Sequence, residues 1–269
     1  AWGMHAIASS RGIRTFERTS VVSFEDAGSH VVLSTGDHQI RARRVVVATN
    51  AFPSLVPAVR RRVVPVYDYV LMTEPLSESQ WESVGWHERE GVSDAGNQFH
   101  YYRPTEDGRI LWGGYDAVYH SGNGFGVEFE NDEASYRRLA THFLQTFPQL
   151  EGIRFSHAWG GAIDTCTRFT TFWGTAAGGK LAYLAGFTGL GVGASRFAAQ
   201  VALDLLDGRA TQRTRLTMVS TLPRPFPPEP MRSIGIRWTT ASLRRADANG
   251  GKRNIWLRSL DRLGMGFDS

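Results

Sequence analysis

The residues with the clearest capacity for chemistry form a glycine-rich segment, Gly-Phe-Thr-Gly-Leu-Gly-Val-Gly-Ala-Ser-Arg, at positions 186–196. It joins an apolar stretch at residues 181–185 directly to a helical pattern that runs to about Leu206. A strand-to-helix turn of this kind brings backbone N–H groups and the positive end of a helix against an electron-rich group of a ligand. The identity of that ligand is the first question that the sequence raises.

The spacing of Gly189, Gly191 and Gly193 is similar to the glycine fingerprint that binds a dinucleotide pyrophosphate. Such a fingerprint opens a domain and is followed by a second strand that ends in an acidic residue. Here a helix ending at Gly208 and a proline-rich stretch at residues 223–230 follow instead. The context therefore argues against a pyrophosphate site. Two interpretations stay open, a structural turn without a ligand and a helix that points at another part of a cofactor.

A second chemical pair is Tyr101 and Arg103, in an expected strand at residues 98–104. Side chains alternate between the two faces of a strand, so these two share a face. A tyrosine and an arginine together suit a substrate carboxylate, through a phenolic hydrogen bond and a bidentate guanidinium pair. Residues 103–109 also read as a plain hairpin turn, and anchoring that turn is an equally good role for Arg103.

Four segments together resemble the FAD-dependent amino acid and amine oxidase family, the D-amino acid oxidase and glycine oxidase group. They are residues 44–50 (RVVVATN), 101–114 (YYRPTEDGRILWGG), 158–164 (AWGGAID) and 186–195. The resemblance spans residues 1 to about 208 and implies an enzyme that oxidises a C–N bond of a small amine or amino acid. It implies hydride transfer to the flavin and release of an imine that hydrolyses.

The resemblance also implies where the cofactor lies. The start of the helix at residues 190–206 would face the pyrimidine end of the flavin and stabilise the charge of the reduced ring. Ala48 and Thr49 follow a buried strand, at the end where open α/β sheets place ligands. The expected cofactor contacts are Val22, Ala48, Thr49, Gly160, Gly161, Gly186, Gly189, Leu190, Gly191 and Val192. For Val22, a plain core position is an equally good interpretation.

The catalytic candidates around the substrate are Tyr101, Arg103 and Trp159, and the resemblance makes Trp159 a wall of the pocket. Some relatives attach flavin covalently through a cysteine in this neighbourhood. Cys166, the single cysteine, falls several residues past that position, so we expect non-covalent FAD.

Members of the family begin with a strand, a G-x-G-x-x-G turn and a helix that bind the ADP half of FAD. This sequence begins at Ala1 in a helical pattern, with no initiator methionine. We therefore expect the C-terminal part of a longer flavoprotein, with weak or absent FAD binding by residues 1–269 alone. A standalone domain built from this region is the alternative.

The elements that must position these residues predict an α/β plus α+β fold. Residues 1–52 are expected to be the remainder of a FAD-binding α/β domain, and residues 53–180 a substrate domain on a mixed, mainly antiparallel sheet. Residues 181–208 return to the first domain, and residues 209–269 form a proline-rich linker and a helical tail. Extended segments are expected at 13–17, 21–24, 31–34, 39–40, 44–49, 63–73, 98–104, 109–115, 154–163, 168–173 and 181–185, and helices at 132–146, 190–206, 239–248 and 255–263.

Composition excludes several other classes. The 269 residues carry 30 Lys and Arg against 26 Asp and Glu, a net charge of +4 without the aromatic-interleaved patch of a nucleic-acid binder. The sequence contains no H-E-x-x-H, C-x-x-C, G-x-S-x-G or P-loop motif, so no metal is expected. One cysteine and no long apolar run fit a cytoplasmic protein without a membrane partner.

A second function class stays open. In it, this region is a non-catalytic binding or assembly module whose basic tail contacts a partner, or a second copy in a homo-oligomer. A flavin spectrum from the complete gene product would separate the two classes.

Overall fold

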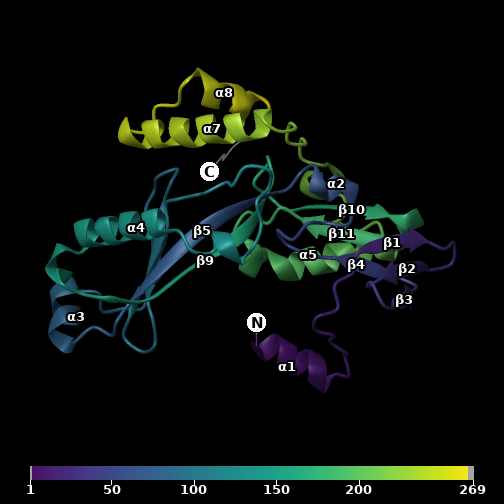
Figure 1. Ribbon diagram of the computed structural model, residues 1–269, viewed down its shortest axis with the longest axis horizontal. Coiled ribbons are helices and arrows are strands. Elements are labelled where there is room, and N and C mark those ends of the chain that lie inside the picture. The colour runs from purple at the N-terminus through teal and green to yellow at the C-terminus, as the bar shows by residue number, and fades with distance from the viewer. Residues whose placement is uncertain (1, 266–269) are drawn as a thin grey trace.

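A computed structural model describes residues 2–265. Ala1 and residues 266–269, which belong to the predicted first domain and tail, lie outside the described residues. The longest strands, β5 (Val64–Thr73) and β9 (Phe155–Thr165), run through one half of the molecule to its middle, where the second half begins (Figure 1). They pair with each other along their whole length and form a continuous two-stranded element that reaches both halves.

The larger sheet has the order β6-β7-β8-β5-β9, with every neighbouring pair antiparallel. Its remaining strands are β6 (Val92–Ser93), β7 (His100–Pro104) and β8 (Ile110–Gly114). Strand β5 places Tyr67, Tyr69 and Leu71 in the buried core. The residues between them must therefore point to the opposite face.

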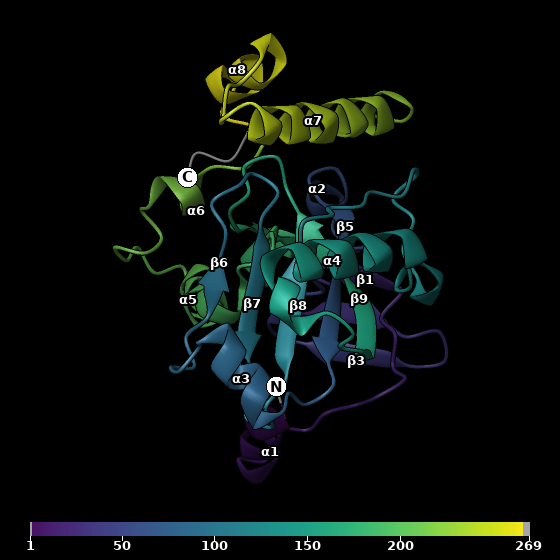
Figure 2. The same cartoon turned by 90° about the vertical axis from the view of Figure 1, so that its left-hand side faces the viewer.

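Helix α4 (Glu133–Thr146) covers the packed face of this sheet, as the turned view shows (Figure 2). Asp132 caps the helix by accepting a hydrogen bond from the Ser135 N–H group at 2.7 Å. Leu139 and Phe143 of the helix are buried against Trp112 of β8. A shorter helix, α3 (Glu78–Val84), packs at the edge of the same core and begins with a capping box at Ser77.

The second half is built on a three-stranded sheet of order β10-β11-β4. Strand β11 (Leu181–Ala185) is parallel to β4 (Val45–Val47) and antiparallel to β10 (Phe172–Ala176). Helix α5 (Gly191–Leu206) follows β11 and packs on this sheet through its buried residues Ala198, Val201 and Ala202. A separate antiparallel meander contains β1 (Ser23–Asp26), β2 (Val31–Ser34) and β3 (Gln39–Ala42).

The C-terminal segment forms a helical hairpin of α7 (Met231–Ala248) and α8 (Ile255–Arg262), which lies beside the body of the molecule (Figure 1). Helix α7 is held by polar contacts. The Asp247 carboxylate accepts hydrogen bonds from the N–H groups of Asn97 and Gln98 at 2.8 and 3.0 Å, and Arg244 donates to Asp116 at 3.0 Å. The remaining helices are α1 (Trp2–Ser10), α2 (Pro57–Arg60) and α6 (Thr217–Ser220).

The predicted fold class is confirmed, and several element boundaries are corrected. Residues 13–17 do not form a strand, and β10 begins at Phe172 instead of residue 168. Helix α7 begins at Met231 instead of residue 239, because the Glu229 carboxylate accepts the N–H and hydroxyl of Ser233 and stabilises the early start. The division into domains stays a prediction. Within residues 2–265, no helix has the length and apolar content needed to cross a membrane.

The attachment of the hairpin gives a first test. Replacing Asp247→Ala removes a charged acceptor that is worth about 1.5–3 kcal/mol for a hydrogen bond of this kind. We expect amide hydrogen exchange at Asn97 and Gln98 to accelerate by about tenfold or more. Arg245→Ala, in the same turn of α7, is the matched control. Equal exchange rates in the two variants would contradict this account of the attachment.

Candidate functional site

The candidate site lies on the face of the larger sheet that α4 leaves uncovered, called here the outer face. Its residues follow from the strand register, because Tyr101 pairs with Gly113, Gly113 with Val70, and Val70 with Trp159. Residues two positions away along each strand share that face. The outer face therefore presents Asp68, Tyr101, Arg103, Gly113, Trp159, Gly161 and Ile163.

Tyr101 lies flat across the neighbouring strand β8. A Cβ atom built on Gly113 would sit 2.7 Å from the Tyr101 hydroxyl oxygen, so the ring occupies the space that a side chain at this position would take. This placement carries the hydroxyl past β8 to β5, where it donates a 2.7 Å hydrogen bond to the Asp68 carboxylate. Two distant strands are thereby joined by one side chain.

The Asp68 carboxylate is partly buried, and its other oxygen accepts a 2.9 Å hydrogen bond from the Tyr69 N–H group. Burial raises the pKa of Asp68, while the bond from Tyr101 opposes that rise. The pKa of Tyr101 is raised as well, first by burial and then by the carboxylate beside it. Among the described residues, no cationic side chain forms an ion pair with Asp68.

Arg103 shares the face of Tyr101, as predicted, but the two side chains make different contacts. Arg103 is exposed, and its guanidinium donates a 3.2 Å hydrogen bond to the carbonyl of Pro104. None of the ion pairs formed within residues 2–265 uses it. Tyr101 has a single O–H donor, and Asp68 already accepts it. Arg103 is thus the more available of the two for an anionic group.

The residues Trp159, Gly160 and Gly161 on β9 divide between the two faces. Trp159 is on the outer face with 39% of its surface exposed. Gly161 shares that face, and a Cβ atom built on it would meet nothing within 4 Å. Gly160 points the other way, where an added Cβ would lie 2.5 Å from the ring of Tyr69. The structure therefore places Gly161 beside open space and gives Gly160 a packing role.

The glycine-rich turn lies in space beside the end of β9. One buried carboxylate connects the two segments. Asp164, 1% exposed, accepts hydrogen bonds from the N–H groups of Gly186 at 2.6 Å and Phe187 at 3.1 Å. Its backbone carbonyl accepts another from Thr188 at 3.2 Å. Burial raises the pKa of Asp164, and the two amide bonds counter part of that effect. The N–H of Gly186, a predicted cofactor contact, is therefore occupied by the protein itself.

The start of α5 is open. No side chain of residues 2–265 caps it, and Leu190 and Val192 are 63% and 99% exposed. Within residues 2–265, no group accepts a hydrogen bond from the N–H groups of Gly191, Val192 or Gly193, whereas Leu190 donates to the Phe187 carbonyl at 2.9 Å. Three free amides at one helix end form an anion-attracting group.

The open helix start and the outer face are neighbours. A Cβ atom built on Gly189, which has a φ of +85°, would lie 3.9 Å from the Cδ1 atom of Ile163. Ile163 is two residues from Gly161 along β9, which corresponds to about 7 Å in a strand. Gly189, at the start of the helix, thus lies next to Ile163 of the outer face.

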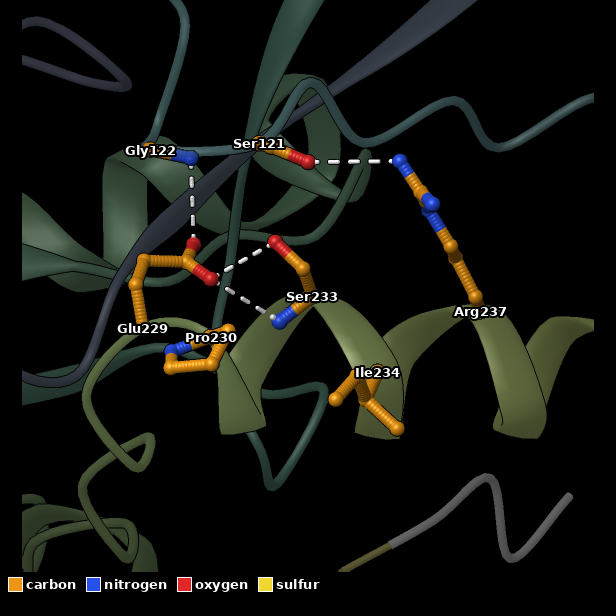
Figure 3. Close-up of a pocket in the computed structure, with 7 residues that line it drawn as sticks. All are labelled: Ser121, Gly122, Glu229, Pro230, Ser233, Ile234 and Arg237. Atoms are coloured by element: carbon orange, nitrogen blue, oxygen red, sulfur yellow. Dashed lines mark hydrogen bonds between the residues drawn. The ribbon is translucent and has the colours of Figure 1, made fainter.

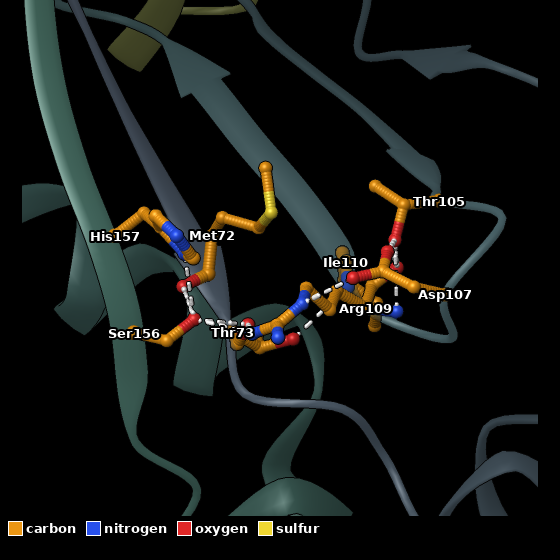
Figure 4. Close-up of polar contacts among 8 residues, drawn as sticks. All are labelled: Met72, Thr73, Thr105, Asp107, Arg109, Ile110, Ser156 and His157. Atoms are coloured by element: carbon orange, nitrogen blue, oxygen red, sulfur yellow. Dashed lines mark hydrogen bonds and ion pairs between the residues drawn. The ribbon is translucent and has the colours of Figure 1, made fainter.

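The far end of the outer face is closed by polar contacts of Arg109 (Figure 4). Its guanidinium donates to the Ser156 hydroxyl at 2.6 Å and to the Thr73 carbonyl at 3.1 Å, and it pairs with Asp107 at 2.6 Å. These bonds tie β8 to the ends of β5 and β9. Arg109 is therefore a structural residue of this sheet.

The predicted contacts at Ala48 and Thr49 lie apart from the outer face, in a hollow of about 700 Å³ over β4. Apolar residues of the meander and of β4 form most of its wall, including Val21, Phe24 and Val46. Val22 is 59% exposed, and its N–H group donates to the Ser34 carbonyl at 2.8 Å. Val22 is thus an exposed position at the edge of the meander and not a core residue, which corrects that alternative interpretation.

A second hollow, of about 560 Å³, lies where the start of α7 meets the loop after β8 (Figure 3). The Glu229 carboxylate occupies its centre and accepts hydrogen bonds from Tyr119 at 2.6 Å and Gly122 at 3.0 Å. Together with the bonds from Ser233, these donors lower the pKa of Glu229 to about 2. This hollow contains a satisfied structural carboxylate, which fits a joint between the hairpin and the body.

Sequence reasoning missed the two carboxylates that organise the site. Asp68 carried a readable signal, because it is the only charged residue in the otherwise uncharged strand β5. Asp164 follows the predicted Trp-Gly-Gly segment, but its contact with Gly186 joins residues far apart in the chain. Only the folded arrangement shows that contact.

Similarity to known proteins covers most of the chain. Residues 1–205 match the family model described as FAD dependent oxidoreductase. The gamma-glutamylputrescine oxidoreductase of Escherichia coli is 31% identical over 224 residues, which cover 80% of this chain and 48% of the relative. The probable oxidoreductase OrdL of Haemophilus influenzae is 26% identical over 204 residues, with coverages of 73% and 43%. The chain thus spans about half the length of the curated relatives it matches.

Solved structures resemble the fold. The glycine oxidase of Bacillus cereus superposes with a TM-score of 0.64 at 17% identity, covering 81% of this chain and 57% of that one. The L-proline dehydrogenase of P. horikoshii gives a TM-score of 0.62 at 19% identity, with coverages of 77% and 54%. At these identities the likeness shows the fold alone.

The Asp164 contact gives the test for this site. Asp164→Ala leaves two buried N–H groups without acceptors, so we expect a loss of unfolding free energy of about 2–5 kcal/mol. The measurement is chemical denaturation of the purified protein. Asp107→Ala, which removes an exposed carboxylate from the turn before β8, is the control and should cost much less unfolding free energy, because exposed ion pairs contribute little. A similar loss in both variants would show that Asp164 does not hold the turn.

Proposed function

This chain belongs to the FAD-dependent oxidoreductase family, and on that premise we propose that its gene product oxidises a C–N bond of a small amine or amino acid. The resemblance predicted from the sequence is confirmed by the family match over residues 1–205. The finer parts of the proposal are the substrate class, hydride transfer and non-covalent attachment of the flavin. The single observation that carries flavin binding is the open start of α5 beside the outer face of the larger sheet.

The residues at this place fit a flavin. Free N–H groups at Gly191, Val192 and Gly193 can approach the pyrimidine end of the ring, because no side chain of the described residues caps them. When bound, FAD supplies the two-electron acceptor for amine oxidation. The helix end favours the added negative charge by about 0.3–2 kcal/mol.

The protein residues then orient the substrate and exclude water. Trp159, on the outer face, provides an apolar wall, and Arg103 provides a positive charge for a carboxylate where the substrate has one. One relative is named gamma-glutamylputrescine oxidoreductase and one fold neighbour is a glycine oxidase, and both names support an amine or amino acid substrate. Neither name identifies the particular substrate of this chain.

Non-covalent attachment is supported by the surroundings of Cys166. The side chain is fully buried, and its thiol donates to the Thr170 carbonyl at 3.2 Å. Burial raises the pKa of this thiol, so it is held in the unreactive protonated form. The Cys166 side chain belongs to the core under β11, away from the outer face.

A cytoplasmic location stays a proposal, supported by the single buried cysteine. The assembly alternative also keeps one supporting observation, an exposed apolar stripe on α7. Met231, Ile234 and Trp238 of this helix are 64%, 58% and 59% exposed. Such a stripe suits a homo-oligomer contact through the tail. The two functions are compatible, since the stripe belongs to the hairpin and the flavin surface to the sheet.

The proposal predicts a yellow gene product whose flavin is sensitive to charge at the start of α5. Val192 is 99% exposed, so replacing it does not disturb packing. We expect Val192→Glu to lower the two-electron reduction potential of the flavin by on the order of 10–40 mV relative to Val192→Gln. A carboxylate at this helix end opposes the negative charge of the reduced ring. Dye-equilibrated redox titration of the two variants measures the difference.

Two results would contradict the proposal. The first is a complete gene product that contains no flavin after purification in the presence of FAD. The second is an equal potential in Val192→Glu and Val192→Gln, which would place the flavin away from the helix start. A carboxylate at the first turn stabilises the helix itself, so loss of folding is not the expected outcome of either variant.

A further inference from the structure

Asp68 is a half-buried carboxylate of the outer face that forms no ion pair within residues 2–265. It lies on the outer face directly opposite Gly161 in the strand register. Because Gly161 has no side chain and no atom of the described residues lies within 4 Å of its Cβ position, there is room for a ligand atom beside the carboxylate. A buried or half-buried charge is costly unless it is paired.

Two aromatic residues of the outer face, Tyr101 and Trp159, lie on strands near this space. Tyr101 reaches Asp68 from β7 by crossing Gly113, and its hydroxyl donates the 2.7 Å hydrogen bond. Trp159 is diagonal to Asp68 on the same face, since its cross-strand partner is Val70. Diagonal positions of neighbouring strands are within reach of an aromatic side chain. A carboxylate near two aromatic residues is a suitable environment for an organic cation.

We propose that Asp68, with Tyr101 and Trp159 nearby, binds a cationic ammonium group of the substrate. This inference rests on the proposed function and adds a residue that determines substrate charge. A carboxylate group would be repelled at this place, and the only O–H of Tyr101 is already donated to Asp68. The outer face thus separates a negative site at Asp68 from a positive one at Arg103, two residues beyond Tyr101 on β7.

Substrate selection follows from that separation. A simple amine needs only the Asp68 site, while an amino acid can place its ammonium group at Asp68 and its carboxylate toward Arg103. A monocarboxylic acid without nitrogen has no favourable position beside Asp68. The open position at Gly161 admits a substituent on the nitrogen, because no side chain of β9 fills it.

The test is isothermal titration calorimetry on the complete gene product with three probes of equal chain length. They are n-butylammonium chloride, n-butanol and sodium butyrate. We expect n-butylammonium to bind the unaltered protein more tightly than the other two, and Asp68→Asn to weaken it by tenfold or more. Glu74→Gln, which neutralises an exposed carboxylate just beyond the end of β5, is the matched control and should change the affinity by less than twofold.

A second variant covers the case in which Asp68→Asn fails to fold. Gly161→Val adds a branched side chain that a strand tolerates, and it fills the space beside Asp68 while leaving the carboxylate in place. We expect it to weaken n-butylammonium by fivefold or more. Circular dichroism checks that each variant is folded.

The outcomes separate this inference from the proposed function, because the absorbance spectrum of each sample reports its flavin content independently. If n-butylammonium binds with the same affinity to Asp68→Asn, or to Gly161→Val, in a protein that contains flavin, the inference is overturned and the proposed function stands. If the protein lacks flavin but its affinity for n-butylammonium still depends on Asp68, the proposed function is overturned and the inference stands.

Discussion

The arrangement of this molecule depends on one joint, where the buried carboxylate of Asp164 accepts the first two N–H groups of the glycine-rich turn. Strand β9 belongs to the larger sheet, and the turn leads from β11 into helix α5, so the joint connects the two halves. A buried carboxylate is held here only because backbone amides satisfy it. This contact holds the open start of α5 in position next to the outer face.

The same joint explains which glycines of the turn face a ligand. Gly186 uses its N–H group for Asp164, and a Cβ at this position would lie 2.9 Å from the Cys166 sulfur. Gly191 and Gly193 make no such contact with the described residues and leave their N–H groups free. The first glycine of the motif, Gly186, therefore anchors the turn, while Gly191 and Gly193 leave their N–H groups exposed. A pattern of glycines alone does not contain that division, because glycine serves close packing and open backbone equally well.

The sequence was informative wherever a local period or a cap determines the structure. The alternation in β5, the Asp132 cap of α4 and the apolar strand before the glycine-rich turn all correspond to elements that the structure contains. It was less informative where distant residues meet. Helix α7 starts early because Glu229 reaches Ser233, and the turn is held by Asp164. Neither interaction produces a periodic pattern in the sequence.

The site also depends on a contact between residues that are distant in the sequence. Tyr101 was found because it shares one face of β7 with Arg103, but its role depends on Gly113 of the next strand. With any larger residue there, the ring could not lie across β8, and its hydroxyl could not reach Asp68. A glycine in a strand usually marks a close approach by another group. Here the approaching group is the Tyr101 ring. Without this approach, the Asp68 carboxylate would lose the hydrogen bond from the Tyr101 hydroxyl. The chemistry of the site is therefore decided by a residue that has no functional group.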